Sequence, residues 1–169
     1  MKSGRRRSRE FALQALYQWL LAGTSLADLE KQVAEMDGYK HADAKLFSAL
    51  LAGVMKHHDA HAEALAPHLD REWKDVSPIE RAILLIGAHE LIAMKETPYR
   101  VAINESIELG KVFGGTDGHK YVNGILDRLA ATVRTEEIAF QSGGEVPARA
   151  KAPRKTAPVV VKKTRKVAK

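Results

Sequence analysis

The sequence predicts an all-α protein, a compact bundle of about six or seven helices followed by a disordered basic C-terminal tail. Three observations carry this prediction. Apolar residues recur at helical spacing through most of the chain up to residue 133, and no stretch alternates with the period of a strand. Capping signals precede several of these segments. The 169 residues, 45% of them hydrophobic, suffice for one domain with a sizeable core.

The first half of the chain contains three predicted helices. Residues 5–22 carry a helical stripe of apolar residues and are followed by Gly23, a typical helix stop. Ser25 opens a capping box for a second helix, which ends before Gly38. Residues 42–65 read as one longer helix that ends before Pro67. Trp73, at a helix junction beyond it, is expected to be a packing anchor.

The second half is predicted to contain the central helix, residues 77–95. Ser77 is a suitable N-cap, Pro78 fits the first helical position and Glu80 completes a capping box. Apolar residues then cover nearly every direction around the axis, as in a helix surrounded by other helices. Polar residues near its ends, among them His89 and Glu90, are expected to meet solvent or partners.

Two further helices complete the predicted domain, which spans residues 1–140. Thr97 and Pro98 provide a cap and a first-turn proline for a helix that ends at Gly114. Thr116 or Asp117 would cap the last helix, which runs to about residue 133. Residues 141–169 turn to Gly, Ala, Pro, Lys and Arg, a composition that cannot bury enough apolar surface to order itself.

The net charge of +6 is concentrated at the two ends. Residues 1–9 hold five Lys or Arg and no acid, and residues 145–169 hold nine against one glutamate. The remaining body has 13 basic and 20 acidic residues, a net charge of −7. Because basic residues cluster while the body is acidic, we expect a localised site for a polyanion rather than a uniformly basic surface.

Composition excludes several classes of chemistry. The absence of cysteine rules out disulfides, zinc–thiolate sites and thiol nucleophiles. No apolar run approaches the roughly 20 residues that span a bilayer, and no secretory signal follows the N-terminal arginines, so we expect a cytoplasmic protein. No phosphate-binding loop, dinucleotide-binding glycine motif, serine elbow or His-Glu-x-x-His motif is present. We therefore expect no enzymatic activity.

Two weaker patterns have simpler explanations than catalysis or metal binding. Glu105 and Glu108 share a helical face and could form a carboxylate pair, but they are more simply explained as solvated or hydrogen-bonded helix residues. His57 and His61 lie one turn apart without an obvious third ligand, which is more typical of a polar helix face than of a metal site. We expect neither a metal nor a cofactor.

Two stretches have the composition of an RNA-binding surface. Cations in the first turn of the first helix interact unfavourably with the helix dipole, and a function in binding phosphate would explain why they are there. The alternative is a frayed N-terminus that only increases solubility. The turn between the last two helices combines cations, aromatics and glycine, a mixture that binds single-stranded RNA. A glycine C-cap with both aromatics packed in the core is its alternative. The residues concerned are Arg5, Arg6, Arg7 and Arg9, and Lys111, Phe113, Gly114, Gly115, His119, Lys120 and Tyr121.

Four ordered segments of the chain resemble the NusB family of bacterial transcription antitermination factors. They are Arg5-Arg6-Arg7-Ser8-Arg9-Glu10 with Ala12-Leu13-Gln14-Ala15-Leu16-Tyr17, Ile79-Glu80-Arg81-Ala82-Ile83-Leu84 with Glu90-Leu91, Pro98-Tyr99-Arg100-Val101-Ala102-Ile103-Asn104-Glu105, and His119-Lys120-Tyr121-Val122-Asn123-Gly124-Ile125-Leu126-Asp127. The resemblance covers residues 5–134. The tail beyond it is longer than the usual ending of the family.

The resemblance implies a helical protein that pairs with NusE, a small-subunit ribosomal protein, and binds the boxA element of nascent RNA. The complex would let RNA polymerase read through terminators, notably in ribosomal RNA operons. It implies RNA contacts by the four arginines and by Lys111, Phe113, Gly114, His119, Lys120 and Tyr121. The NusE-facing surface would include Glu80, with Arg81 and Leu84 as neighbours.

Two other interpretations remain at the level of the sequence. The first is a protein-binding helical module with a basic tail that binds nucleic acid without specificity. The second is an RNA methyltransferase, because NusB-like domains also occur fused to such enzymes, but this chain is too short for the catalytic domain. The sequence leaves open whether the chain forms homo-oligomers.

Overall fold

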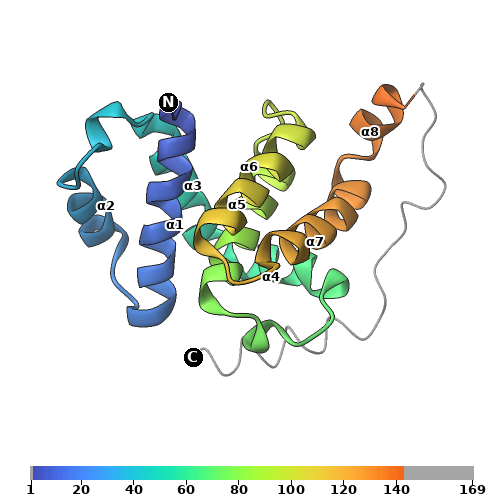
Figure 1. The fold of residues 1–169 in the computed structure, drawn as a ribbon, viewed down its shortest axis with the longest axis horizontal. Helices are drawn as coiled ribbons and strands as arrows, with labels where there is room; N and C mark the ends of the chain where they lie inside the picture. Colours follow the sequence, from blue (N-terminus) through green and yellow to red (C-terminus); the bar gives the residue numbers. More distant parts are fainter. Residues whose placement is uncertain (1, 143–169) are drawn as a thin grey trace.

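The computed structural model describes residues 2–142, which form eight α-helices and three short 3-10 segments and no strand (Figure 1). The predicted all-α fold is confirmed. The predicted tail, apart from its first two residues, lies outside the described part of the chain. The helices are α1 (Gly4–Ala22), α2 (Leu26–Ala34), α3 (Ala44–Lys56), α4 (His58–Leu65), α5 (Pro78–Ala93), α6 (Tyr99–Phe113), α7 (Gly118–Val133) and α8 (Thr135–Gln141).

Helix α5 is the centre of the fold, as predicted. It packs against α1, α3, α4, α6 and α7, and every residue from 82 to 91 is buried. Ser77 Oγ accepts a hydrogen bond from the Glu80 amide at 3.2 Å, which confirms the predicted cap. The expectation that His89 and Glu90 face solvent is wrong, because both are buried and bonded to other helices.

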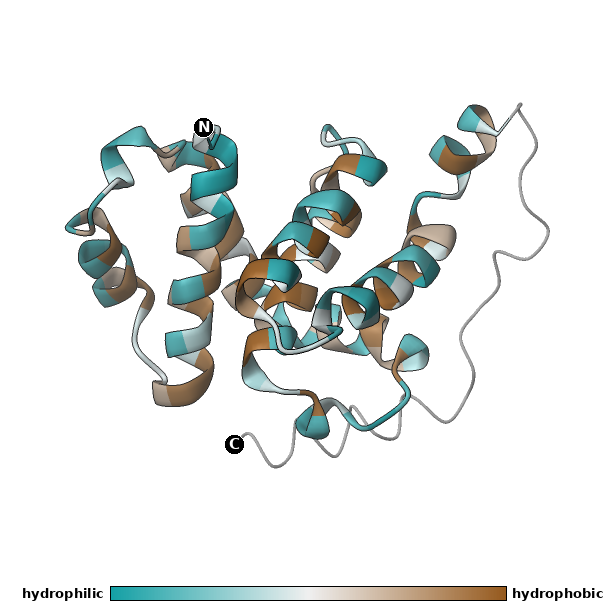
Figure 2. Ribbon diagram, viewed as in Figure 1, coloured by the Kyte–Doolittle hydropathy of each residue, from teal (hydrophilic) through white to brown (hydrophobic). Residues whose placement is uncertain are grey.

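Apolar side chains on the inward faces of the helices form one continuous core. Figure 2 shows the hydrophobic residues gathered on the sides of the ribbons that face one another and the hydrophilic residues on the outer sides. Trp73, predicted to be a packing anchor, is fully buried and belongs to this core. No helix among residues 2–142 has both the length and the apolar character needed to cross a membrane.

The predicted helix over residues 42–65 is in fact two helices. His57 leaves the α conformation, with φ −108° and ψ 22°, and separates α3 from α4. The change in direction lets both α3 and α4 pack against α5. The apolar spacing on either side of His57 gave no indication of the break, because each half keeps a helical period of its own.

The cap predicted for α6 is also different. Thr97 does not cap this helix; instead the Tyr99 amide donates to Glu137 Oε2 at 2.9 Å. Glu137 belongs to α8, a short helix that the sequence patterns did not reveal. Asp117 occupies the N-cap position of α7 with φ 64°, but its side chain makes no capping hydrogen bond. A long-range contact has replaced the local cap at the start of α6.

Two buried histidines join α4 to α5. His61 Nε2 and His89 Nδ1 are 2.9 Å apart, so one ring donates an N–H and the other accepts it. His57 stacks on His89 with ring centroids 6.4 Å apart. A Cβ at Gly53 would lie 2.3 Å from His89 Nε2, so α3 approaches this ring closely only because residue 53 is glycine. No group of three His, Asp or Glu side chains in residues 2–142 is arranged to hold a metal ion.

This histidine pair predicts loss of stability in mild acid. Burial, with the neighbouring histidines, lowers the pKa of His61 to about 4, and burial also lowers that of His89. The unfolded chain therefore binds protons at a higher pH than the folded chain, and the stabilisation present above about pH 6.5 is lost as the pH falls towards 4. We expect the free energy of unfolding, measured with urea, to fall by about 2 kcal/mol over this range from His61.

Replacement of the buried ring provides the control for this prediction. His61→Gln should be less stable than the parent at pH 7.5 but should show a flatter decline between pH 6.5 and 4.5, whereas His41→Gln, at an exposed site, should decline like the parent. An unchanged pH profile in His61→Gln would contradict the assignment.

Candidate nucleic-acid and partner interface

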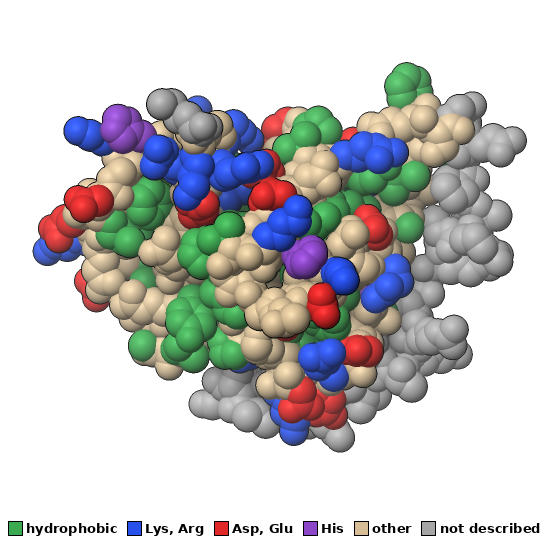
Figure 3. Space-filling view, viewed as in Figure 1, with side chains coloured by type: hydrophobic (Ala, Val, Ile, Leu, Met, Phe, Trp, Pro, Cys, Tyr) green, Lys and Arg blue, Asp and Glu red, His purple; other side chains and the backbone are tan. Residues whose placement is uncertain are grey.

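The N-terminal arginines begin at the open end of α1, where Figure 3 shows Lys and Arg side chains gathered. Ser3 Oγ caps the helix by accepting from the Arg6 amide at 3.1 Å. Arg5 is exposed, and its Nη1 lies 3.6 Å from Asp43 Oδ2. The Arg7 side chain is half-buried and makes no hydrogen bond or ion pair within the described residues. These two guanidinium groups are the least neutralised of the four.

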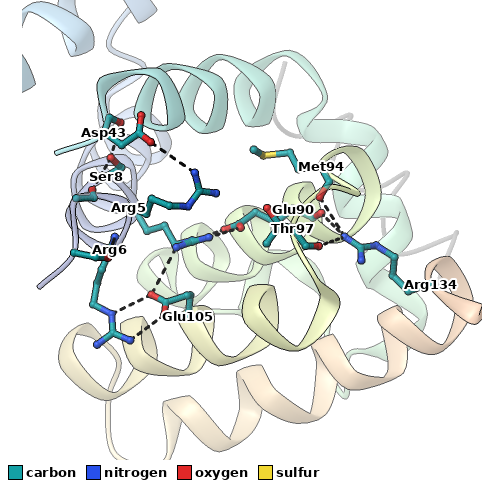
Figure 4. A network of polar contacts seen from close by, with 12 residues as sticks. Arg5, Arg6, Ser8, Asp43, Glu90, Met94, Thr97, Glu105 and Arg134 are labelled. Carbon is teal, nitrogen blue, oxygen red and sulfur yellow. Dashed lines mark hydrogen bonds and ion pairs between the residues drawn. The ribbon is translucent and has the colours of Figure 1, made fainter. Parts of the chain in front are cut away.

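Arg6 is paired more tightly than Arg5 or Arg7. Its Nε and Nη2 donate to the two carboxylate oxygens of Glu105 on α6, at 3.0 and 2.9 Å (Figure 4). The side chain is still 39% exposed, so the guanidinium lies at the surface with one edge occupied. Glu105 is thus neither a solvated surface carboxylate nor one of a catalytic pair; it joins α6 to α1.

Arg9 is buried, which corrects its expected role. Its side chain is only 3% exposed, and its Nε and Nη2 donate to the Glu90 carboxylate at 2.7 and 2.8 Å. Nη1 lies 3.7 Å from Glu105. Because α1 packs this face against α5 and α6, Arg9 cannot reach an RNA phosphate without opening the core. Its function is to hold α1 in place.

A second buried arginine, not identified from the sequence, closes the same network from α7. Arg134 Nε donates to the Leu91 carbonyl at 2.8 Å, and Nη2 donates to the carbonyls of Glu90, Met94 and Thr97. These carbonyls belong to the last turn of α5 and the loop after it, so Arg134 serves as a C-terminal cap for the central helix. In the sequence, Arg134 is simply a basic residue at the end of a predicted helix. Nothing near it in the chain indicates that it binds the end of α5.

In the turn between α6 and α7, the lysines lie at the surface and the aromatic side chains pack against other residues. Gly114 ends α6, its amide bonded to the Gly110 carbonyl at 2.9 Å. Lys111 and Lys120 are exposed, and His119 is half-buried between them in the chain. On the face shown in Figure 3, further Lys, Arg and His side chains lie over the region of α6 and α7. The basic surface at the start of α1 therefore extends, with interruptions, towards this turn.

The two aromatic residues of the turn have other partners. The Arg71 guanidinium lies 4.5 Å from the ring centre of Tyr121 and covers one of its faces. Burial raises the pKa of the Tyr121 hydroxyl to about 12. Phe113 is half-buried and packs against the core. The turn thus has the geometry of the alternative that the sequence left open, a glycine C-cap with packed aromatics, while its cations remain at the surface.

The three expected partner-facing residues lie at different depths. Glu80 is half-buried, and a Cβ at Gly118 would lie 2.9 Å from its Oε2, so the start of α7 approaches this carboxylate closely. Arg81 is half-buried, and its Nε has no hydrogen-bond partner among the described residues. Leu84 is fully buried because α5 is enclosed by other helices at this position. Leu84 is therefore a core residue and not part of a surface.

An apolar groove lies beside Glu80, and the sequence analysis did not identify it. Its volume is about 630 Å³. Among its lining residues, Tyr17, Leu21 and Met36 are large hydrophobic side chains that are 39%, 58% and 38% exposed. The lining consists of Leu13, Gln14, Ala15, Tyr17, Gln18, Leu21, Ala22, Gln32, Val33, Met36, Ile79 and Phe113. The spacing of Leu13, Tyr17 and Leu21, four residues apart, was the available indication of a second apolar stripe on α1.

The fold and these surfaces define a class of protein. An all-α domain that presents exposed cations at the start of α1 and an apolar groove along the second half of the same helix has two surfaces that are typical of binding sites. Residues 6–131 match the NusB family. The chain belongs to the NusB family.

Relatives of similar length support the same assignment. Proteins named transcription antitermination protein NusB are 52% identical over 143 residues in Burkholderia lata, covering 85% of this chain and 99% of the relative, and 53% identical over 137 residues in Neisseria gonorrhoeae, covering 81% and 97%. A NusB structure from T. maritima superposes with a TM-score of 0.69 at 29% identity, over 82% of this chain and 99% of that one. A structure of NusB and NusE with double-stranded RNA gives 0.63 at 26% identity, over 74% and 94%.

The different depths of the arginines predict different consequences of their removal. Arg9→Ala leaves the Glu90 carboxylate buried without its partner, and we expect a loss of about 3–5 kcal/mol in the free energy of unfolding. Arg7→Ala removes no side-chain hydrogen bond or ion pair within the described residues and should change stability by less than about 0.5 kcal/mol. Chemical denaturation of both variants tests this; equal stability of Arg9→Ala and Arg7→Ala would contradict the structural role of Arg9.

Proposed function

We propose that this chain is a transcription antitermination factor that binds boxA-type RNA together with the ribosomal protein NusE and helps RNA polymerase to read through terminators, notably in ribosomal RNA operons. Relatives that are about half identical carry the name of this function, and one similar structure contains NusB, NusE and RNA. The carrying observation in this chain is that α1 presents accessible arginines at its start and an apolar groove along its second half. We infer that the protein works in the cytoplasm, where nascent transcripts and ribosomal proteins meet.

The RNA-binding surface that we propose is formed by the cations that remain accessible in the structure. Arg5, Arg6 and Arg7 lie on the first turn of α1, and Lys111, His119 and Lys120 lie on the turn between α6 and α7. Because the body of the domain is acidic, RNA affinity has to come from this local group of cations. Gly114 lies where α6 ends and the turn towards α7 begins. Phe113 and Tyr121 support this turn by packing against the core.

The partner surface that we propose is the apolar groove with Glu80 on the adjoining turn. Ile79 lines the groove, and Glu80 follows it in the first turn of α5, where its carboxylate faces the start of α7. Interfaces commonly combine a few apolar anchors with a polar rim, and Tyr17, Leu21 and Met36 provide exposed apolar side chains. The occupant we assign is NusE. The half-buried Arg81 has an unsatisfied Nε and is a second polar group available to the partner.

A protein-binding module with a nonspecific basic tail is the alternative function. The two functions differ in where RNA binding resides. If the domain binds RNA, deletion of residues 143–169 should leave preferential binding of a boxA-like RNA over a scrambled RNA in the presence of NusE. If only the tail binds, the deletion should abolish binding to both RNAs equally.

Removal of the accessible arginines tests the RNA surface. We expect Arg5→Ala combined with Arg7→Ala to weaken boxA-like RNA binding and to reduce the slope of log affinity against log salt by about 1.4, because two phosphate contacts on a single strand are lost. Lys56→Ala, which removes a cation at the opposite end of α3 from Asp43, is the matched control. Fluorescence anisotropy at two salt concentrations measures both quantities, with circular dichroism to confirm folding. Parental binding by the double variant would remove these residues from the surface.

A charged residue placed in the groove tests the partner surface. We expect Leu21→Glu to weaken NusE binding by about 1–2 kcal/mol, and Glu80→Lys to weaken it without unfolding the domain. Val101→Glu alters an exposed hydrophobic residue on α6 outside the groove and should bind normally. Isothermal titration calorimetry distinguishes these outcomes. Normal NusE binding by Leu21→Glu would assign the groove to another occupant.

A further inference from the structure

The contact between Arg6 and Glu105 joins a proposed RNA-binding residue to an acid at the same surface. The two side chains form a bidentate pair, with distances of 3.0 and 2.9 Å, between the first turns of α1 and the middle of α6. This geometry uses the Nε and Nη2 donors of the guanidinium, the same fork that binds a phosphate in two-point fashion. The Arg6 fork is therefore already occupied by an anionic group of the protein.

Glu105 is held from its buried side as well. Arg9 Nη1 lies 3.7 Å from its Oε1, and Arg9 is itself fixed by two hydrogen bonds to Glu90 (Figure 4). The hydrogen bonds from Arg6, with the charge of Arg9, lower the pKa of the Glu105 carboxyl, so it stays ionised near neutral pH. Displacing a carboxylate that is held from both sides costs free energy, because its contacts with Arg6 have to be broken.

The other acids near Arg6 are engaged elsewhere. Glu10 Oε1 accepts from Lys2 at 2.9 Å, and Glu108 Oε2 accepts from Lys111 at 3.3 Å. Asp43 lies near Arg5, at 3.6 Å, and Arg7 makes no ion pair within the described residues. Among Arg5, Arg6 and Arg7, Arg6 is thus the one whose bidentate edge is fully taken by a carboxylate.

We propose that Glu105 competes with RNA phosphate for Arg6 and thereby weakens the binding of RNA by this chain alone. A phosphate either displaces the carboxylate from the fork or binds the outer edge of Arg6 beside a fixed negative charge, and both arrangements are less favourable than binding to a free arginine. The consequence is that RNA is retained only when other contacts, including those of the partner protein, add to the affinity. This inference rests on the proposed function.

Neutralising the competitor tests the inference. Glu105→Gln keeps the shape and one oxygen that can accept from Arg6 but removes the charge. We expect the variant alone to bind boxA-like and scrambled RNA about two- to fivefold more tightly than the parent, with a salt slope steeper by about 0.7. Glu96→Gln controls for net charge and should bind like the parent, because Glu96 is exposed and forms no ion pair within the described residues.

A second pair of variants assigns the effect to Arg6. In an Arg6→Ala background, Glu105→Gln should add no affinity beyond that of Glu96→Gln, and Arg6→Ala alone should lose less affinity than Arg7→Ala, since Arg6 is already neutralised. This second comparison does not require Glu105→Gln to fold, and thermal melts by circular dichroism monitor all variants. A gain that persists without Arg6, or a larger loss for Arg6→Ala than for Arg7→Ala, would overturn the inference.

The failure of this inference differs from the failure of the proposed function. If the parent binds RNA and the Arg5→Ala, Arg7→Ala double variant loses affinity, but Glu105→Gln binds no more tightly than Glu96→Gln, only the competition by Glu105 is refuted. If the parent binds neither RNA, with or without NusE, the proposed function fails and the inference falls with it.

Discussion

The buried ion pair between Arg9 and Glu90 is the interaction on which the arrangement of this molecule depends. Burying two charges is unfavourable unless the geometry is close and the remaining donors are used, and here Arg9 donates twice to Glu90 and lies near Glu105. Arg134 binds the backbone carbonyl of the same Glu90 from α7. The pair therefore fixes α1 on the central helix, while Arg134 holds the end of α7 against the same helix. The surface arginines that precede Arg9 are positioned by this buried contact.

The same network determines how much positive charge reaches the surface. Of the four N-terminal arginines, one is buried, one is held in a bidentate pair and one lies near an aspartate, so a count of cations in the sequence overstates the local potential. Exposed ion pairs contribute little to stability, and their partners remain available when a stronger anion arrives. The degree to which these arginines are neutralised therefore differs, from Arg7, which has no ion pair within the described residues, to Arg9, which is fully paired.

Local sequence patterns were sufficient to predict most of the helices, but not which side chains of the candidate site are accessible. The cap at Ser77, the stop at Gly23 and the enclosed character of α5 follow from neighbouring residues, and the structure contains all three. The break at His57, the cap of α6 by Glu137 and the burial of Arg9 depend on residues that are distant in the chain. The run of four arginines does not indicate which of them lies on the face of α1 that other helices cover.

The partner groove and the basic turn share residues, which links the two halves of the proposed function physically. Phe113 ends α6 and lines the groove, while Lys111, two residues earlier, is exposed on the candidate RNA surface. A partner that packs on Phe113 restrains the end of α6 and with it the turn that carries His119 and Lys120. Restraint before RNA arrives reduces the entropy lost on RNA binding, so partner binding favours RNA binding even without a contact between the two ligands.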